Sequence, residues 1–180
     1  MMNRMLTALG LVFLLGAGAT MPALPSFDTS NWRMTGSNPS GYSGDRTVDT
    51  AGVATITIKA NAQATADTFG TLAYKMDAGT YRGDHLAVTG ALSTAAATSG
   101  RFWMRVDDAD GKALRFDNMA NRALQGDTAW TPFKIVLDVP SNARTIYLGL
   151  LLVGSGSASA RDIRFGPVSK DTPTTNMLPQ

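Results

Sequence analysis

Residues 131–139 read TPFKIVLDV, and an apolar side chain stands at every second position from Phe133 to Val139. A period of two residues places successive side chains on opposite faces of an extended chain. The polar Lys134 and Asp138 fall on the other face. This segment therefore predicts a β-strand with one face turned to a hydrophobic core.

Similar alternation recurs through the chain, separated by stretches rich in Gly, Asn, Asp, Pro and Ser, including a turn predicted at Thr98–Gly100. Residues 144–153 (RTIYLGLLLV) are apolar on both faces and predict a central strand that is covered twice. Only residues 117–124 (DNMANRAL) predict a helical turn or two. Seven or eight short strands predict an all-β fold, a β-sandwich with jelly-roll topology. The remaining predicted strands are 54–60, 71–76, 84–94, 102–107 and 161–165.

The composition excludes several classes of function. The chain has 180 residues, one domain's worth, with no Cys, so it has no disulfide, thiolate metal site or cysteine nucleophile. All 14 acidic residues are Asp, a residue that favours turns. The formal net charge is +2 and no segment concentrates the basic residues, which argues against nucleic acid as a partner.

The N-terminus predicts export. Arg4 precedes an apolar run at 6–16 (LTALGLVFLLG) and small residues at 17–19 (AGA), the pattern of a cleavable signal peptide. The run is too short to span about 30 Å of hydrocarbon. We expect a signal peptide at 1–19, a β-sandwich domain at 20–168 and a disordered tail at 169–180. The predicted location is the bacterial periplasm or the exterior, with no membrane span left after cleavage.

Residues 20–45 lack periodicity but carry Phe27, Trp32 and Tyr42, which predicts a loop strapped across the domain.

Signatures of catalysis and of metal binding are absent. The one histidine, His85, is accompanied by no G-x-S-x-G elbow, and a chain without Glu has no H-E-x-x-H zinc site. Residues 106–112 (VDDADGK) place Asp side chains near calcium-loop positions, but a hairpin turn explains them with fewer demands. We therefore expect no enzyme, no catalytic residue, no metal site and no cofactor.

The strongest functional signal lies between Arg101 and Asp138. If Phe102, Met104 and Val106 enter the core, Trp103 and Arg105 lie on the opposite face. An indole stacks on a sugar ring and a guanidinium offers a planar fork of donors, so the pair predicts a binding platform. The alternative is that Trp103 is covered by the N-terminal segment or by residues 117–124, with Arg105 paired to an Asp.

Four stretches together resemble a known motif set: WMRVD (103–107), RFDNMANRALQGDTAW (115–130), IVLDVPSNA (135–143) and IYLGLLLVGSG (146–156). The set is similar to bacterial jelly-roll domains of the galactose-binding-like, carbohydrate-binding-module-like superfamily, a poorly characterised type found in exported proteins and appended to regulators. The resemblance covers about residues 32–168. One departure is at 159–162 (SARD), where small residues replace a Trp that commonly precedes the acidic residue.

The resemblance implies a polar cluster of Arg105, Asp117, Asn118 and Arg122. This cluster would either fasten residues 117–124 to the sheet or contact a ligand, with Asn118 and Arg122 the first choices for that contact. Together with Trp103, these four are the candidate ligand-binding residues.

The predicted function is non-catalytic binding of a glycan or another small polar ligand in the cell envelope. The alternative is a structural or interaction domain that meets another envelope protein. A third hypothesis is a hydrolase that uses Asp residues and His85.

Overall fold

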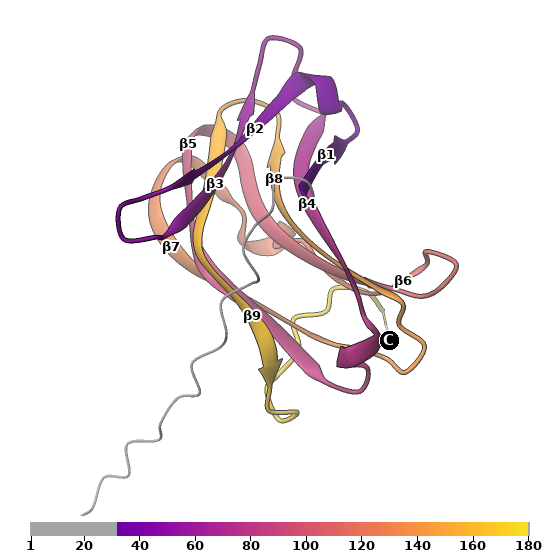
Figure 1. The fold of residues 1–180 in the computed structure, drawn as a ribbon. Helices are drawn as coiled ribbons and strands as arrows, with labels where there is room; N and C mark the ends of the chain where they lie inside the picture. The colour runs from indigo at the N-terminus through magenta and orange to yellow at the C-terminus, as the bar shows by residue number, and fades with distance from the viewer. Residues whose placement is uncertain (1–31, 180) are drawn as a thin grey trace, which may run out of the picture.

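The computed structural model describes residues 32–179, so the predicted signal peptide at 1–19 lies outside the described residues. Nine strands and three short 3-10 turns make up the fold (Figure 1). The strands are β1 (Trp32–Gly36), β2 (Tyr42–Val48), β3 (Ala54–Ala60), β4 (Phe69–Asp77), β5 (His85–Asp107), β6 (Ala113–Asp117), β7 (Leu124–Asp138), β8 (Thr145–Val153) and β9 (Ser157–Val168). The turns are η1 (Pro39–Gly41), η2 (Gly79–Tyr81) and η3 (Ala120–Arg122).

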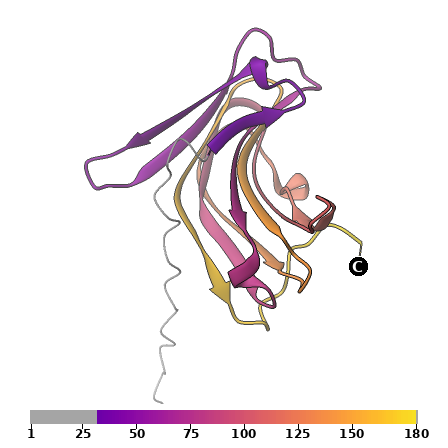
Figure 2. The same ribbon diagram turned by 45° about the vertical axis from the view of Figure 1, so that its right-hand side comes forward.

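Strand β5 belongs to both layers of a sandwich. Its first half pairs with β9 and β7, and its second half pairs with β8 and β6. One layer therefore runs β2-β3-β9-β5-β7 and the other runs β1-β4-β8-β5-β6, with every pairing antiparallel. Figures 1 and 2 show the two curved layers facing each other. The predicted all-β sandwich with jelly-roll topology is confirmed.

The turn predicted at Thr98–Gly100 is wrong, because the chain continues through it as one 23-residue strand. The strand instead changes layer through a series of register shifts between Leu92 and Gly100, and Ala96 adopts a φ of 49°. Bulges of this kind bend a strand and increase its twist. Gly100 permits the bend, since a Cβ there would lie 2.5 Å from Cγ2 of Thr94. Gly and Ser in this segment therefore mark a corner between sheets.

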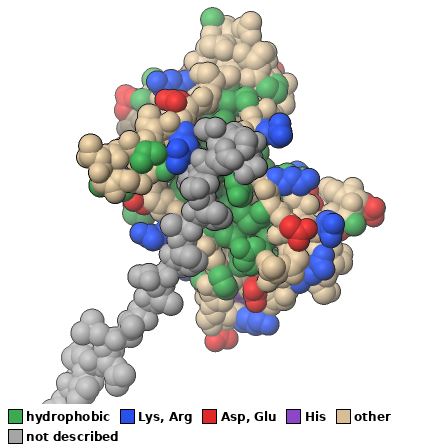
Figure 3. Space-filling model, viewed as in Figure 1, with side chains coloured by type: hydrophobic (Ala, Val, Ile, Leu, Met, Phe, Trp, Pro, Cys, Tyr) green, Lys and Arg blue, Asp and Glu red, His purple; other side chains and the backbone are tan. Residues whose placement is uncertain are grey.

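The core fills the space between the layers with the side chains that the alternation predicts. Phe102, Met104 and Val106 are fully buried, and the ring of Phe102 stacks on Phe133 with centroids 4.7 Å apart. Strand β8 lies between β4 and β5, which confirms its predicted central position, but it is covered on one face only, since Tyr147, Leu151 and Val153 on the other face line a cleft. Figure 3 shows hydrophobic side chains gathered along the opening between the layers, flanked by charged side chains.

The predicted N-terminal loop is wrong for its described part, because residues 32–36 and 42–48 are strands at the edges of the two layers. Trp32 packs against Tyr74 of β4, with ring centroids 5.5 Å apart. The hydroxyl of Tyr42 donates to the carbonyl of Thr68 at 2.8 Å. These two segments are strands because β1 pairs with β4 and β2 pairs with β3. Their own sequence has little periodicity from which a strand could be predicted.

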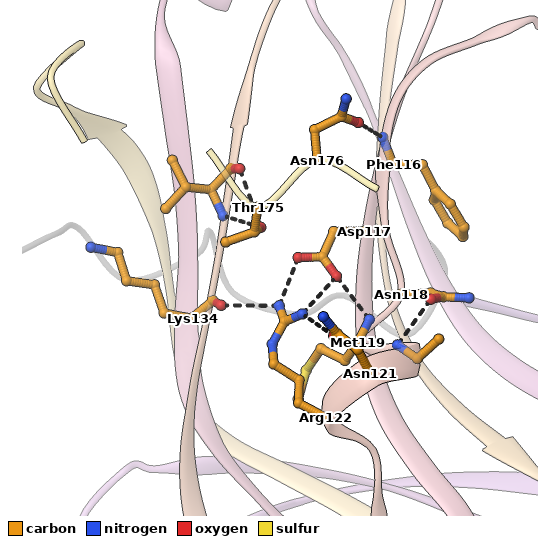
Figure 4. A network of polar contacts seen from close by, with 11 residues as sticks. Phe116, Asp117, Asn118, Met119, Asn121, Arg122, Lys134, Thr175 and Asn176 are labelled. Atoms are coloured by element: carbon orange, nitrogen blue, oxygen red, sulfur yellow. Dashed lines mark hydrogen bonds and ion pairs between the residues drawn. The ribbon is translucent and has the colours of Figure 1, made fainter. Parts of the chain in front are cut away.

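The tail at 169–180 was expected to be disordered. In the structure, residues 172–178 of this tail lie against the sandwich. The amide of Thr175 donates to the carbonyl of Val136 on β7, and the amide of Met177 donates to the carbonyl of Phe116 on β6. In return, Phe116 N–H donates to Asn176 Oδ1 at 3.0 Å and Val136 N–H to Thr175 Oγ1 at 3.0 Å (Figure 4). Strands β6 and β7 are edges whose backbone groups need partners, and the tail supplies them.

Removing residues 173–180 should lower the free energy of unfolding by about 1–3 kcal/mol, because several net-favourable hydrogen bonds are lost. Hydrogen exchange of the Phe116 and Val136 amides should accelerate, while the amide of Leu148 in the central strand should keep its relative protection. Asn176→Ala should reproduce the effect at Phe116, and Gln125→Ala, which changes an exposed side chain of β7, should not. Unchanged exchange at Phe116 in the truncated chain would contradict the role given to the tail.

Candidate ligand-binding cleft

A cleft of about 550 Å³ lies on the face of the β1-β4-β8-β5-β6 layer that points away from the core. This volume is in the range of small-ligand sites. Its described lining is aromatic, aliphatic, amide, hydroxyl and guanidinium in character, without a carboxylate. The lining residues are Thr35, Gly36, Phe69, Thr71, Ala73, Arg101, Trp103, Arg105, Phe116, Asn118, Tyr147, Leu151 and Val153.

Trp103 forms the floor of this cleft. Its indole covers Gly149, its partner on β8, where an added Cβ would stand 2.1 Å from Nε1. The Nε1–H group donates to Thr71 Oγ1 at 2.7 Å, and that hydroxyl donates to the carbonyl of Leu150 at 2.9 Å. Trp103 is consequently only 9% exposed and its orientation is fixed. The indole of Trp103 therefore lies at the bottom of the cleft, and it does not project from the sheet as the predicted binding platform would.

Two further aromatic rings frame Trp103. Tyr147 on β8 lies nearly parallel to the indole, with centroids 6.5 Å apart, and Phe116 on β6 meets it at 61° and 6.4 Å. Tyr147 is half-buried and lines the cleft, with Nζ of Lys75 5.8 Å from the centre of its ring. The sequence analysis missed Tyr147 because it sits in a run that is apolar on both faces, where no alternation marks an outward position.

Two arginines of β5 lie in the cleft with different partners. Arg105 is paired with Asp107, with Nη2 and Oδ2 2.7 Å apart, and its guanidinium carbon lies 5.1 Å from the centre of the Tyr147 ring. The pairing of Arg105 with an Asp is the alternative that the sequence left open.

Arg101 has no carboxylate partner within residues 32–179, and its Nε–H donates to Ser99 Oγ at 2.9 Å. Burial lowers the pKa of Arg101, because lost hydration disfavours the charged guanidinium. Sequence reasoning did not select Arg101, although its place two residues before Trp103 puts it on the same face.

The predicted polar cluster is divided by strand β6. Asn118 lines the cleft and its Oδ1 accepts from the amide of Ala120 at 3.1 Å. Asp117 is fully buried on the other face, where both carboxylate oxygens accept from Arg122, at 2.6 and 3.1 Å (Figure 4). The structure therefore brings Trp103, Arg105 and Asn118 together, and it places the Asp117–Arg122 pair elsewhere.

The Asp117–Arg122 pair ties a turn to both layers. Asp117 Oδ1 accepts from the amide of Met119 at 2.8 Å, at a residue whose φ is 54°. Arg122 Nη2 also donates to the carbonyl of Lys134 on β7 at 3.3 Å. Because a buried carboxylate must be paired, these contacts hold η3, the single helical turn that forms within residues 117–124, between β6 and β7.

The geometry of the described residues does not support catalysis at His85 or calcium binding at residues 106–112, where a hairpin turn was predicted. His85 Nδ1 lies 3.3 Å from the carbonyl of Thr172, and no described carboxylate is hydrogen-bonded to the ring. Asp108 Oδ1 accepts from the amides of Asp110 and Lys112, as in a hairpin turn. Within residues 32–179 no group of three or more His or Asp side chains could hold a metal ion.

Solved structures share this architecture. The family 11 carbohydrate-binding module of a Clostridium thermocellum cellulosomal cellulase matches with a TM-score of 0.53 and 14% identity, over 87% of this chain and 100% of that one. The C-terminal family 22 carbohydrate-binding module of Clostridium thermocellum Xyn10B matches with a TM-score of 0.52 and 13% identity, over 81% of this chain and 91% of that one. The domain has the β-sandwich fold of carbohydrate-binding modules. The resemblance inferred from the sequence motifs is confirmed at the level of the fold.

Two other similarities cover only part of the matching protein. The enzymatically active domain of bacteriophage CBA120 tailspike protein 4 matches with a TM-score of 0.59 and 12% identity, over 78% of this chain and 20% of that one. In sequence, the chain is 36% identical over 110 residues to the uncharacterized HTH-type transcriptional regulator YbfP of Bacillus subtilis, across 61% of this chain and 37% of that protein. The chain thus spans about a third of that relative. No family model matches the chain. In the described range, 32–179, no helix is long and apolar enough to cross a membrane.

Asp117→Asn should lower the free energy of unfolding by about 2–3 kcal/mol, because it leaves a partly buried guanidinium without its counter-charge. Asp138→Asn is the matched control, since Asp138 pairs with Arg115 at a site where both side chains are about a quarter exposed. We expect about 1 kcal/mol or less there. Denaturant titration measures both values, and equal losses would contradict the special role of Asp117.

Gly149→Ala should displace the indole of Trp103, because the added methyl group would occupy the position of the ring. We expect a large shift of the Trp103 indole N–H resonance, loss of its hydrogen bond to Thr71 and a destabilisation of about 1–3 kcal/mol from overpacking. Gly52→Ala is the control for backbone strain alone, since Gly52 has a φ of 80° but nothing lies within 4 Å of its added Cβ; it should destabilise the fold and leave the Trp103 resonance in place. An unmoved Trp103 resonance in Gly149→Ala would contradict the described floor.

Proposed function

We propose that this protein is a non-catalytic module that binds a glycan in the cleft on the β1-β4-β8-β5-β6 layer. The observation that carries the proposal is the composition of the cleft: an aromatic floor and a half-buried tyrosine beside two guanidinium groups. Sugar rings have apolar faces that stack on aromatic rings and hydroxyl groups that accept from guanidinium donors. Trp103 and Tyr147 would provide the apolar surface, and Arg105 and Asn118 would provide hydrogen bonds.

The comparisons support a binding role for the domain. Two of the similar folds are carbohydrate-binding modules, and the cleft of the family 22 module holds amino acids with a role in ligand binding. Among the described residues, nothing resembles a catalytic pair around His85. The proposal therefore assigns binding, and it leaves any catalysis to other proteins or domains.

The predicted signal peptide supports action outside the cytoplasm, and we extend the proposal to the periplasm or the cell exterior. The alternative of an interaction domain for an envelope protein finds less support. The large hydrophobic side chains exposed in the described range are Val48, Trp130 and Met177, which lie on β2, on β7 and in the tail. Strands β2 and β7 are separated by β3, β9 and β5, so Val48 and Trp130 are not neighbours, whereas a docking patch has to be contiguous.

Titration of the full chain with neutral and acidic oligosaccharides, followed by calorimetry, tests the proposal. Tyr147→Ala should weaken binding about tenfold or more, the scale of losing a central aromatic contact. Trp130→Ala is the matched control, because Trp130 lies on β7 in the other layer with Arg161 over its ring at 4.3 Å. Equal affinities of the wild type and Tyr147→Ala would place the glycan elsewhere, and no binding across the panel would refute the proposed function.

A further inference from the structure

Positive charge is concentrated on the face that holds the cleft. Pairing aligns Arg33 on β1 with Ala73, and Lys75 on β4 with Tyr147, so both side chains lie on the same face as Arg101 and Arg105. The carboxylates on this face, Asp77 and Asp107, sit together at one end of the layer and are paired with Arg144 and Arg105. The whole chain has a net charge of only +2, so this distribution is local to the face.

Among the described residues, Arg101 is a cation of the cleft that has no carboxylate partner. Its Nη groups make no hydrogen bond within residues 32–179, and its Nε contacts the hydroxyl of Ser99. The side chain is half-buried between Ser99 and the apolar Leu151 and Val153 of β8. A guanidinium that has lost part of its hydration without gaining a carboxylate partner would be stabilised by binding an anion.

The neighbouring ion pair also has unused hydrogen-bonding capacity. Arg105 Nε and Asp107 Oδ1 are both buried and have no hydrogen-bond partner in the described part of the chain. Buried polar atoms are normally satisfied, so each unsatisfied group calls for an explanation such as a ligand or water. The two arginines are four residues apart on β5, about 13 Å along a strand. A ligand that meets both is therefore longer than one sugar ring.

We propose that the glycan is acidic, an oligosaccharide containing uronic acid whose carboxylate binds the free Nη groups of Arg101. This inference rests on the proposed glycan-binding function and names its substrate class. Both oxygens of a carboxylate fit the two parallel donors of a guanidinium fork. In this arrangement Tyr147 and Trp103 contact a sugar ring and Arg101 selects the charged unit.

The test uses the full chain and three ligands of equal length: an oligogalacturonate, its methyl ester and a neutral oligosaccharide. The ester removes the charge and keeps the sugar, so it isolates the carboxylate. We expect the wild type to bind the acid roughly ten- to a hundredfold more tightly than the ester, the scale of a charge-assisted pair. Affinity for the acid should fall as salt is raised, and monomeric galacturonate should bind far more weakly than the oligosaccharide.

Arg101→Gln should abolish the preference for acid over ester, by lowering the affinity for the acid to about that for the ester. Lys59→Gln is the matched control, because it removes one positive charge from the exposed face of β3 in the other layer. Thermal unfolding of both variants confirms that they fold. Arg101→Lys should recover part of the preference, since it keeps the charge but not the fork.

The outcomes separate the two proposals. Equal binding of acid, ester and neutral ligand would overturn the acidic specificity while the glycan-binding function stands. Preference for the acid that survives Arg101→Gln would place the carboxylate at another cation and overturn the role of Arg101. Failure of the wild type to bind any of the three would count against the proposed function itself.

Discussion

The structure depends on strand β5 being continuous through two sheets. Because its first half pairs with β7 and β9 and its second half with β6 and β8, neither layer has a complete set of strands without it. The bulged stretch between Leu92 and Gly100 turns the strand from one layer to the other without interrupting it. Phe102 and Leu92, on either side of this corner, are both fully buried, so the corner and the core are formed by the same residues.

The cleft is a direct consequence of the same strand. Alternation sends Phe102 and Met104 inward, and it sends Arg101, Trp103 and Arg105 outward onto the face that holds the cleft. Small residues on the neighbouring strands then decide how these side chains lie. Gly149 leaves room for the indole, and Thr71 holds its nitrogen. Such fixed side chains lose little rotational freedom when a ligand binds.

The sequence predicted what depends on local periodicity and could not predict what depends on distant partners. The central position of β8 followed from a run that is apolar on both faces, the inward face of β5 followed from alternation, and both are confirmed. The strand character of residues 32–36 depends on β4, and the burial of Trp103 depends on Gly149 and Thr71, which are 46 and 32 residues away. Asp117 and Arg122 were correctly grouped. Asp117 and Asn118, however, are consecutive residues whose side chains lie on opposite faces, so the predicted cluster is divided across β6.

The pairing of early strands with late ones has a consequence for biosynthesis. Strand β4 pairs with β8, whose residues follow about 70 to 85 positions later, and β3 pairs with β9, whose residues follow about a hundred positions later. The nascent chain can form the β1–β4 and β2–β3 pairs while it emerges, but their other edges stay open until the last strands leave the ribosome. Folding through such distant contacts is slow. A translation product that ends before β9 would present the unpaired edge of β3 to other chains, which is a route to aggregation.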